Sequence, residues 1–447
     1  MSTAGTVTAR EAGVFNAKSR RTIVAGWLSM LLQTYDIYLP VIVLPAAITY
    51  FIPKSLSAVT QVTLVNVIFA ISVLAQPIGG LVVAPIADRL GRRTLVLLTN
   101  IGYVVVALAI AVLPGYAAWG YASIVLLLFL RLANGIFAAS SPAGAIPFAL
   151  ERTPKPYRGV VGALLGVGPA SGIVLLSAVQ YLTISAVSPA GFVQSGWRIP
   201  FFFGAFIGLL ETVLAWVTPE IEYFTEEAPK HSEQVKKASV REVFARDNLK
   251  IFGQTLLLYS GFLVAANIIP GYTPTLLINY LHQPPNGVSG MMLIASAITI
   301  VLAIPCGAAS QKIGRRMGLI LNGVIILFVV TPLYFLMVHG ALSHWPFSTI
   351  AVLGSAIDIL AMAPFSGMVF TYLTERYPFH IRASGFGAVY SLSTVLPGFY
   401  SFYLLALSHL MPYQYTVLVM VAIAGLLTWW GAAKGPETRD FDMSPTV

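Results

Sequence analysis

Charged residues are scarce in this chain: Asp, Glu, Lys and Arg make up only 10% of its 447 residues, whereas 57% are hydrophobic. Soluble domains carry about 25% charged residues, so the composition excludes a soluble globular protein. The few charges also fall in short stretches between long apolar segments. Because about 20 apolar residues cross the hydrocarbon core of a bilayer as a helix, the sequence predicts an all-α membrane protein.

Residues that carry catalytic or redox chemistry are scarce as well. Cys306 is the single cysteine, which excludes an internal disulfide and a cysteine metal site. The six histidines fall in loops or at helix ends, which excludes an imidazole relay at mid-membrane. There is no Gly-rich phosphate loop of the Walker type and no embedded nucleophile–base set. We therefore expect neither an enzyme nor an ATP-driven pump, and no metal or cofactor.

Twelve apolar segments are long enough to span a membrane. Their predicted bounds are 22–51, 60–86, 94–113, 119–150, 158–187, 199–218, 250–281, 287–309, 317–338, 347–373, 383–408 and 412–433. They divide the chain into an N-terminal tail (1–21), a first six-helix half (22–218), a linker (219–249), a second six-helix half (250–433) and a C-terminal tail (434–447).

The basic residues indicate which side of the membrane each loop faces. The formal net charge is +9, and all 26 Lys and Arg residues except Lys54, Arg131 and Arg198 fall on one side if the N-terminus is inside. This asymmetry follows the positive-inside rule. It predicts a multi-pass protein of the inner (plasma) membrane with both termini in the cytoplasm. It also explains the excess charge without a nucleic-acid partner.

Two charged patterns occur twice, about half a chain apart. The pattern E-R-x-P-x-x-x-R stands at 151–158 and again at 375–382. The pattern D-R-L-G-R-R at 88–93 is partly repeated as Q-K-I-G-R-R at 311–316. Both pairs lie between apolar segments, so the protein consists of two related membrane halves, as many secondary transporters do.

Four polar residues lie near the middle of predicted helices: Asp36, Arg131, Asn267 and Asp358. An ionised side chain at mid-membrane costs about 3 kcal/mol or more, so each needs a reason to be there. Their helices recur every third along the chain, which indicates three-helix units whose first helices face a central cavity.

Asp36 and Arg131 are expected at equal depth, where they can form an ion pair. Two buried opposite charges partly offset each other's desolvation. In one interpretation Asp36 carries a coupled proton and Arg131 sets its pKa; in the other the pair only locks two helices. Among the remaining carboxylates, Glu211 is expected to reach toward the cytoplasmic charges. The sequence leaves three roles open for Asp358. It could bind a cationic group of the substrate, carry a second proton, or remain protonated in a packed interface.

Polar and aromatic residues near the embedded groups are candidates for substrate binding. Gln33 shares a face of the first helix with Asp36 by its spacing, and a tyrosine ring can stack on a ligand. The candidates are Gln33, Tyr35, Tyr38, Asn267, Tyr272, Asp358 and Tyr390.

The loop at 88–93 resembles the signature that the major facilitator superfamily carries between its second and third helices. In the first copy Ala84 replaces the family's Gly, and in the second copy Gln311 replaces its Asp. The likeness covers all twelve helices. It implies the major facilitator fold, in which two six-helix halves rock around a central site.

Two branches of the superfamily share further residues with the chain. Arg131, Gly135 and the segment 151–159 are similar to proton-coupled sugar porters in their spacing. The segment 196–201, Gly-Trp-Arg-Ile-Pro-Phe, resembles the metabolite:proton symporters instead. The glutamine-rich motif that sugar porters carry in helix 7 is missing, which favours the second branch.

The resemblance also implies a breakable network of cytoplasmic charges. In this network Arg92 and Arg93 face Glu151 and Arg158, Arg315 and Arg316 face Glu375 and Arg382, and Asp88 stands at a helix start. Ion pairs at a wet interface contribute little each, so such a cluster can open at small cost. Alternatively, these loops only fix the topology.

Together these observations lead us to expect a monomeric secondary transporter that imports a small metabolite with protons across the lipid bilayer. The branch resemblance favours an organic acid, with Arg131 as a partner for its carboxylate. Proton-coupled sugar uptake, proton-driven export of drugs or metabolites, and nutrient sensing without transport remain as alternatives.

Overall fold

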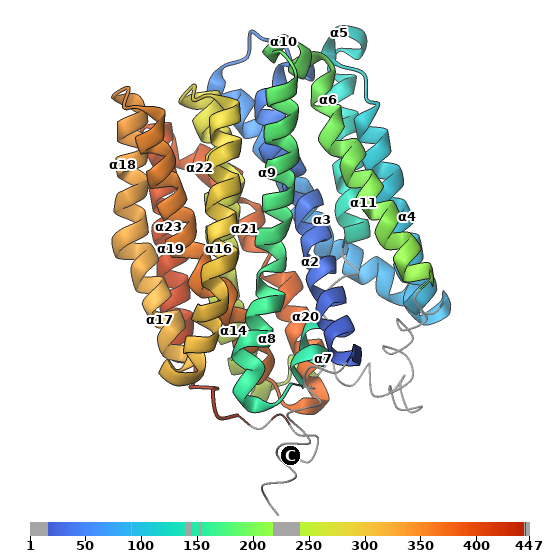
Figure 1. Cartoon of the computed structure of the whole chain (residues 1–447), viewed down its shortest axis with the longest axis vertical. Helices are drawn as coiled ribbons and strands as arrows, with labels where there is room; N and C mark the ends of the chain where they lie inside the picture. Colours follow the sequence, from blue (N-terminus) through green and yellow to red (C-terminus); the bar gives the residue numbers. More distant parts are fainter. Residues whose placement is uncertain are drawn as a thin grey trace, which may run out of the picture.

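The computed structural model of the chain describes residues 17–90, 92–138, 145–151, 153–217, 242–441 and 443. Every regular element within these ranges is helical, so the predicted all-α fold is confirmed. Figure 1 shows the first half of the chain (blue to green) and the second half (yellow to red) as two bundles of steep helices that meet along α9 and α16.

The two halves contain the same kinds of elements. The first comprises α2 (Ala17–Val43), η1 (Leu44–Ala46), η2 (Ile48–Tyr50), α3 (Ala58–Leu90), α4 (Arg92–Ala111), α5 (Tyr116–Trp119), α6 (Ala122–Ala138), α7 (Ala145–Glu151), η3 (Lys155–Tyr157), α8 (Arg158–Gly166), α9 (Gly168–Ala186), α10 (Pro189–Gly191), η4 (Phe192–Gly196) and α11 (Arg198–Val217). The second comprises α14 (Arg246–Ala266), η6 (Asn267–Tyr272), α15 (Thr273–Thr275), η7 (Leu276–Tyr280), α16 (Pro285–Ile313), α17 (Arg315–Ile325), η8 (Ile326–Val330), α18 (Thr331–Leu342), α19 (Phe347–Glu375), η9 (Phe379–Ile381), α20 (Arg382–Leu392), α21 (Val395–Gly398), α22 (Tyr400–Leu407) and α23 (Tyr413–Lys434).

The described helices supply twelve membrane spans. Nine are long and apolar enough by themselves. Two shorter apolar helices, Leu97–Ala111 and Ala122–Phe137, add two more. The 20-residue α11 completes the set. Each half therefore has six spans.

Several predicted helices are interrupted in the structure where proline removes a backbone donor. The first begins at Ala17, inside the predicted tail, and gives way to 3-10 turns after Val43, with Pro45 in the first of these turns. The seventh leaves α-geometry after Ala266 and continues as π-helix through Pro270. Proline cannot donate to the carbonyl four residues earlier, so the regular pattern fails at both places.

Large apolar side chains point outward at mid-helix, as they do in a membrane protein. Phe129, Phe206 and Phe328 are each more than 60% exposed on helices α6, α11 and η8. Conversely, charged side chains are buried between the helices: Arg131 has no exposed surface. This inverted distribution suits a chain whose outer solvent is lipid.

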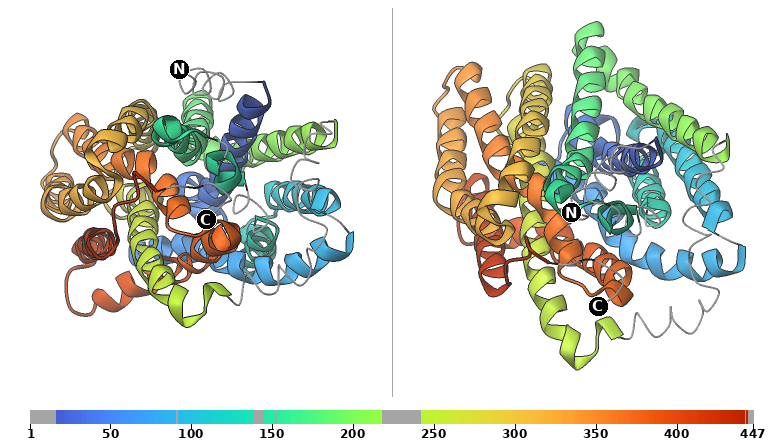
Figure 2. Two further views of the ribbon diagram at one scale, coloured as in Figure 1. Left: turned by 90° about the horizontal axis from the view of Figure 1, so that it is seen from below. Right: turned by 60° about the horizontal axis from the view of Figure 1, so that its bottom comes forward.

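The two halves approach closely at the end of the bundle where the C-terminal tail lies, which we call the tail end (Figure 2, left). A Cβ atom on Gly159 of α8 would meet the carbonyl oxygen of Gly307 of α16. One on Gly166 would likewise meet the carbonyl of Ser366. Small residues that let backbones touch in this way are typical of membrane helix interfaces.

Within the first half, α3 and α6 make a similar approach next to Arg131. Ser72 of α3 donates its hydroxyl hydrogen to the carbonyl oxygen of Arg131 at 2.9 Å. A Cβ atom on Gly135, one turn further along α6, would collide with the carbonyl oxygen of Ser72. Gly135 therefore sets the distance between the two helices and the position of Arg131.

We predict that Gly135→Val lowers the thermal unfolding midpoint of the detergent-purified protein, because overpacking costs about 1–3 kcal/mol. Gly253→Val is the matched control: it makes the same change within a helix, but its Cβ atom meets nothing within 4 Å. Equal midpoints for the two variants would contradict the role assigned to Gly135.

Candidate functional site: a cavity between the halves

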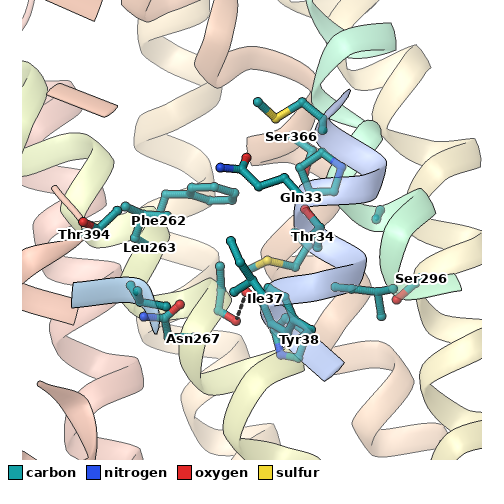
Figure 3. Close-up of a pocket in the computed structure, with 18 of the residues that line it drawn as sticks. Gln33, Thr34, Ile37, Tyr38, Phe262, Leu263, Asn267, Ser296, Ser366 and Thr394 are labelled. Carbon is teal, nitrogen blue, oxygen red and sulfur yellow. Dashed lines mark hydrogen bonds between the residues drawn. The ribbon is translucent and has the colours of Figure 1, made fainter. Parts of the chain in front are cut away.

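A cavity of about 110 Å³ lies between the two halves. One water molecule occupies about 10–15 Å³ on this measure, so the space matches a solute of roughly seven to eleven heavy atoms. Figure 3 shows α2 side chains on one side and Phe262, Leu263 and Asn267 on the other. The polar lining residues are Gln33, Thr34, Tyr38, Gln76, Tyr259, Asn267, Ser296, Thr299, Asp358, Ser366, Tyr390 and Thr394.

One face of α2 forms a wall of this cavity. Its lining residues are Met30, Gln33, Thr34, Ile37 and Tyr38, which follow the i, i+3, i+4, i+7, i+8 spacing of a single helical face. The structure thus brings the candidates Gln33 and Tyr38 to the cavity.

Tyr35, also a candidate, lies on another face of α2. Its hydroxyl donates to the carbonyl oxygen of Pro200 in α11 at 2.8 Å, and its ring is fully buried. Tyr35 therefore ties α2 to α11 within the first half, and the structure does not place it in the cavity lining.

Asp36 faces α6 rather than the cavity, and it meets Arg131 there. A guanidinium nitrogen of Arg131 lies 3.5 Å from Asp36 Oδ1. The side-chain amide of Asn134, one turn further along α6, donates to the same oxygen at 3.1 Å. Asp36 Oδ2 has no hydrogen-bond partner among the described residues. The carboxylate is thus partnered on one oxygen only, which leaves the other able to take a proton.

Pro40, which lies inside α2, explains why Arg131 fits against this helix. Because Pro40 has no N–H group, the carbonyl oxygen of Asp36 lacks its usual donor four residues later. Arg131 Nη2 donates to this carbonyl at 3.4 Å and to that of Ile37 at the same distance. Arg131 therefore holds both the side chain and the main chain of Asp36.

The helix break in the second half contributes to the cavity in a comparable way. Pro270 cannot donate to the carbonyl oxygen of Ala266, and the hydroxyl of Tyr38 donates to that carbonyl from the first half at 3.1 Å. Asn267 opens the π-helical segment, lines the cavity and is only 5% exposed. Its Nδ2 has no acceptor among the described residues. The π-helix thus presents an unused donor to the cavity, and π-segments are frequent at functional sites.

The remaining candidates from the second half divide between lining and packing. Asp358 lines the cavity, and its Oδ2 accepts from the hydroxyl of Thr299 at 3.2 Å. Tyr390 also lines it and donates to Gln33 Oε1 across the halves at 3.0 Å. Tyr272 has no exposed surface and does not line the cavity, so the structure places it in the packed core.

Two of the predicted charged groups at the tail end pair within the second half, and two pair across the halves. Arg315 Nε lies 2.7 Å from Glu375 Oε2, with neither side chain exposed. Arg382 donates to Glu151 Oε1 of the first half at 2.9 Å. The resemblance had placed Arg382 beside Arg315 and Arg316. In the structure Arg382 reaches across instead, because η9 and the start of α20 carry it to the boundary between the halves.

Arg316 and Arg158 contact main-chain carbonyl groups near the C-terminal tail. Arg316 Nη2 donates to the carbonyl oxygen of Ala433 at 2.9 Å. Arg158 Nη1 donates to that of Phe441 at the same distance. The side chains of Asp88, Arg92 and Arg93, also predicted members of the network, lie outside the described residues.

Comparisons with known proteins agree with this architecture. Residues 26–401 match the family model of the Major Facilitator Superfamily. The chain belongs to this superfamily. It is therefore a membrane transporter and not an enzyme.

Among curated superfamily members, the chain is similar to the proline/betaine transporter of Escherichia coli (strain K12), at 26% identity over 94% of this chain and 85% of that one. The glycine betaine/proline/ectoine/pipecolic acid transporter of Dickeya dadantii is also 26% identical, over 92% and 83% of the two chains. The fold is similar to that of the E. coli xylose transporter in a partially occluded inward-open conformation, with a TM-score of 0.70 at 16% identity over 95% and 99% of the chains.

In this superfamily member the C-terminal tail segment, residues 436–441, extends the charge network. Glu437 accepts hydrogen bonds from the backbone N–H groups of Arg315 and Arg316 at 2.8 and 3.1 Å, which caps the start of α17. Thr438 donates to Glu375 at 2.8 Å. Asp440 lies 3.2 Å from Lys155 Nζ in the first half. The tail segment therefore joins the halves at the tail end.

Sequence reasoning missed the tail segment, Lys155 and Asn134 as members of these clusters. A signal existed for Asn134, which follows Arg131 by three residues and so lies on the same helical face. For Lys155 there was none, because only the fold brings it to Asp440.

The cross-half ion pair gives a testable prediction about opening at the tail end. Thr371 is fully buried and donates to the carbonyl oxygen of Arg158 across the boundary, so a cysteine there reacts with a thiol probe only when the halves separate. In a Cys306→Ser, Thr371→Cys background, Arg382→Glu should speed labelling roughly two- to fivefold, since a partly exposed pair contributes about 0.5–1 kcal/mol.

Arg376→Glu is the matched control for this experiment. Arg376 donates to Gln254 within the same half at 3.0 Å, so its reversal should leave labelling unchanged. The double variant Glu151→Arg, Arg382→Glu should restore slow labelling. If Arg382→Glu labels at the rate of the background protein, the ion pair does not hold the halves together.

Proposed function

We propose that this transporter imports a small metabolite together with a proton, using the cavity as its binding site and Asp36 as its proton carrier. The observation that carries the proposal is the half-partnered Asp36 carboxylate, buried beside Arg131 one helical face away from the cavity. Ionisable groups inside a membrane protein are rare and commonly mark substrate or ion pathways.

Protonation of Asp36 changes the charge of a buried cluster without dismantling it. When the carboxyl group is neutral, its attraction for Arg131 weakens, but the guanidinium keeps its hydrogen bonds to the carbonyl oxygens of Asp36 and Ile37. The protonated cluster is therefore tolerated although an unpaired buried charge is costly. Because Ile37 and Tyr38 line the cavity on the same helix, a shift of α2 links proton binding to the solute site.

For the substrate we propose a small metabolite that carries a carboxylate. The sequence favoured an organic acid. Similar proteins are transporters of proline and betaine, which are also carboxylates. Asn267 supplies an amide donor without a partner among the described residues in the cavity, and such a group suits a carboxylate oxygen.

The proposal also covers the membrane location, the topology and the oligomeric state of the protein. The distribution of basic residues supports an inner-membrane location with both termini in the cytoplasm, so the tail end is the cytoplasmic end. We also propose that the protein acts as a monomer, and the support is that residues of a single chain line both sides of the cavity.

Replacement of Asp36 tests the proton-carrier role. In proteoliposomes with an inward proton gradient, Asp36→Asn should abolish accumulation above equilibrium but retain exchange of labelled solute at equal concentrations. Asparagine keeps the size of the side chain, but its amide cannot take up and release a proton near neutral pH. Glu242→Gln, which neutralises a carboxyl group outside the spans, is the control and should accumulate solute normally.

Two results would contradict the role of Asp36. Full accumulation by Asp36→Asn would place proton coupling elsewhere. Loss of both accumulation and exchange would make the Asp36–Arg131 pair a structural lock. Efflux of a preloaded solute as protons enter would instead support the exporter alternative.

A further inference from the structure

A second buried carboxylate, that of Asp358, lines the cavity and differs from Asp36 in having no cationic partner among the described residues. Asp358 is 4% exposed, and Thr299 donates to its Oδ2 at 3.2 Å. Among the described residues that line the cavity there is no Lys, Arg or His. A buried carboxylate with one neutral hydrogen bond is costly unless a cation or a proton neutralises it.

The surroundings of Asp36 and Asp358 differ, which indicates different roles for the two carboxylates. Asp36 has Arg131 and Asn134 against it and faces away from the cavity. Asp358 faces the cavity and lacks any such internal cation among the described residues. When Asp358 is ionised, a counter-charge comparable to the one that Arg131 gives to Asp36 can come only from a cation in the cavity, because the described lining residues supply none.

The walls of the cavity also suit a cation. Tyr38, Phe262, Tyr390 and Tyr259 line it. Their positions are fixed by contacts among rings: Tyr259 stacks on Phe262 at 5.7 Å, and Phe262 on Phe365 at 4.3 Å. Aromatic faces attract ammonium groups, and quaternary ammonium ligands are recognised by cages of this kind. In Figure 3 the ring of Phe262 and the amide of Gln33 enter the cavity from opposite sides.

A solute that carries only a cation would leave the amide donor of Asn267 without a hydrogen-bond acceptor. Its Nδ2 has no acceptor among the described residues although the side chain is nine-tenths buried, and an unmet buried donor carries a desolvation penalty of about 1–3 kcal/mol. A carboxylate oxygen on the solute would satisfy it. Conversely, a solute with carboxylates only would meet Asp358 as a like charge.

We infer that the cavity selects a zwitterion whose ammonium group, quaternary or secondary, binds between Asp358 and the aromatic walls while its carboxylate accepts from Asn267. This inference rests on the proposed transport function and narrows its substrate class, because a simple organic acid would meet the ionised Asp358 as a like charge. Thr299 acts as a positioning residue that orients the carboxylate.

Thermal unfolding of the detergent-purified full-length protein tests the inference without any transport step. A ligand that binds only the folded state raises the unfolding midpoint, and the rise grows with the logarithm of the ratio of ligand concentration to Kd. Glycine betaine and proline should raise the midpoint of the wild-type protein, choline should raise it less, and succinate should not raise it. Asp358→Asn should weaken betaine binding at least tenfold, whereas the control Glu242→Gln should bind as the wild type does.

The design separates misfolding from loss of binding. Removal of a buried carboxylate that lacks a cation should leave the midpoint of unliganded Asp358→Asn equal to or above that of the wild type, which shows that the variant folds. Asn267→Leu should weaken betaine binding but leave choline binding unchanged. Equal betaine affinity in Asp358→Asn and wild type, or binding of succinate in preference to betaine, would overturn the inference.

Failure of this inference and failure of the proposed function give different results. If succinate accumulates with protons and the zwitterions do not, proton-coupled import stands and the role of Asp358 is wrong. If betaine binding depends on Asp358 but no solute accumulates under a proton gradient, the binding site stands and the coupling proposal fails.

Discussion

The contact between Asp36 and Arg131 is the constraint on which the rest of this transporter depends. Either charge alone is costly at mid-membrane, and the packing of α2 against α6 brings the two together. Gly135 allows the close approach of α3 that positions Arg131, and Pro40 leaves a carbonyl for the guanidinium to bind. Three separate features of the sequence therefore converge on one buried cluster.

Breaks in the helices shape the cavity beside this cluster, which is the proposed binding site. Where proline removes a backbone donor, a side chain from another helix donates to the free carbonyl oxygen. Arg131 donates to the carbonyl oxygen of Asp36, and Tyr38 donates to that of Ala266 in the opposite half. Irregular backbone is tolerated at membrane depth only where protein or a cavity satisfies it. The same breaks that weaken the helices thus place polar groups at the cavity and provide a contact between the halves.

Much of this arrangement could be predicted from the sequence, because charges in an apolar chain have few permitted places. Hydropathy predicted the spans, and the embedded residues predicted the Asp36–Arg131 pair. It was harder to predict which side chains point into the cavity. Tyr35 and Tyr272 have the same residue type and depth as the lining tyrosines, and only the packing of the helices decides which of them reach the cavity. The cross-half partner of Arg382 was also missed, since it depends on how two bundles dock rather than on a local pattern.

Proton movement that accompanies solute entry is the most direct test of the central claim. Proteoliposomes with a pH-sensitive dye inside and no initial pH gradient should be given a concentration gradient of glycine betaine, with succinate in a parallel sample. The account predicts that the lumen acidifies as the solute enters and that acidification stops when solute flow stops. Solute entry at constant lumen pH would contradict it, because the transporter would then work without the proton that Asp36 is proposed to carry.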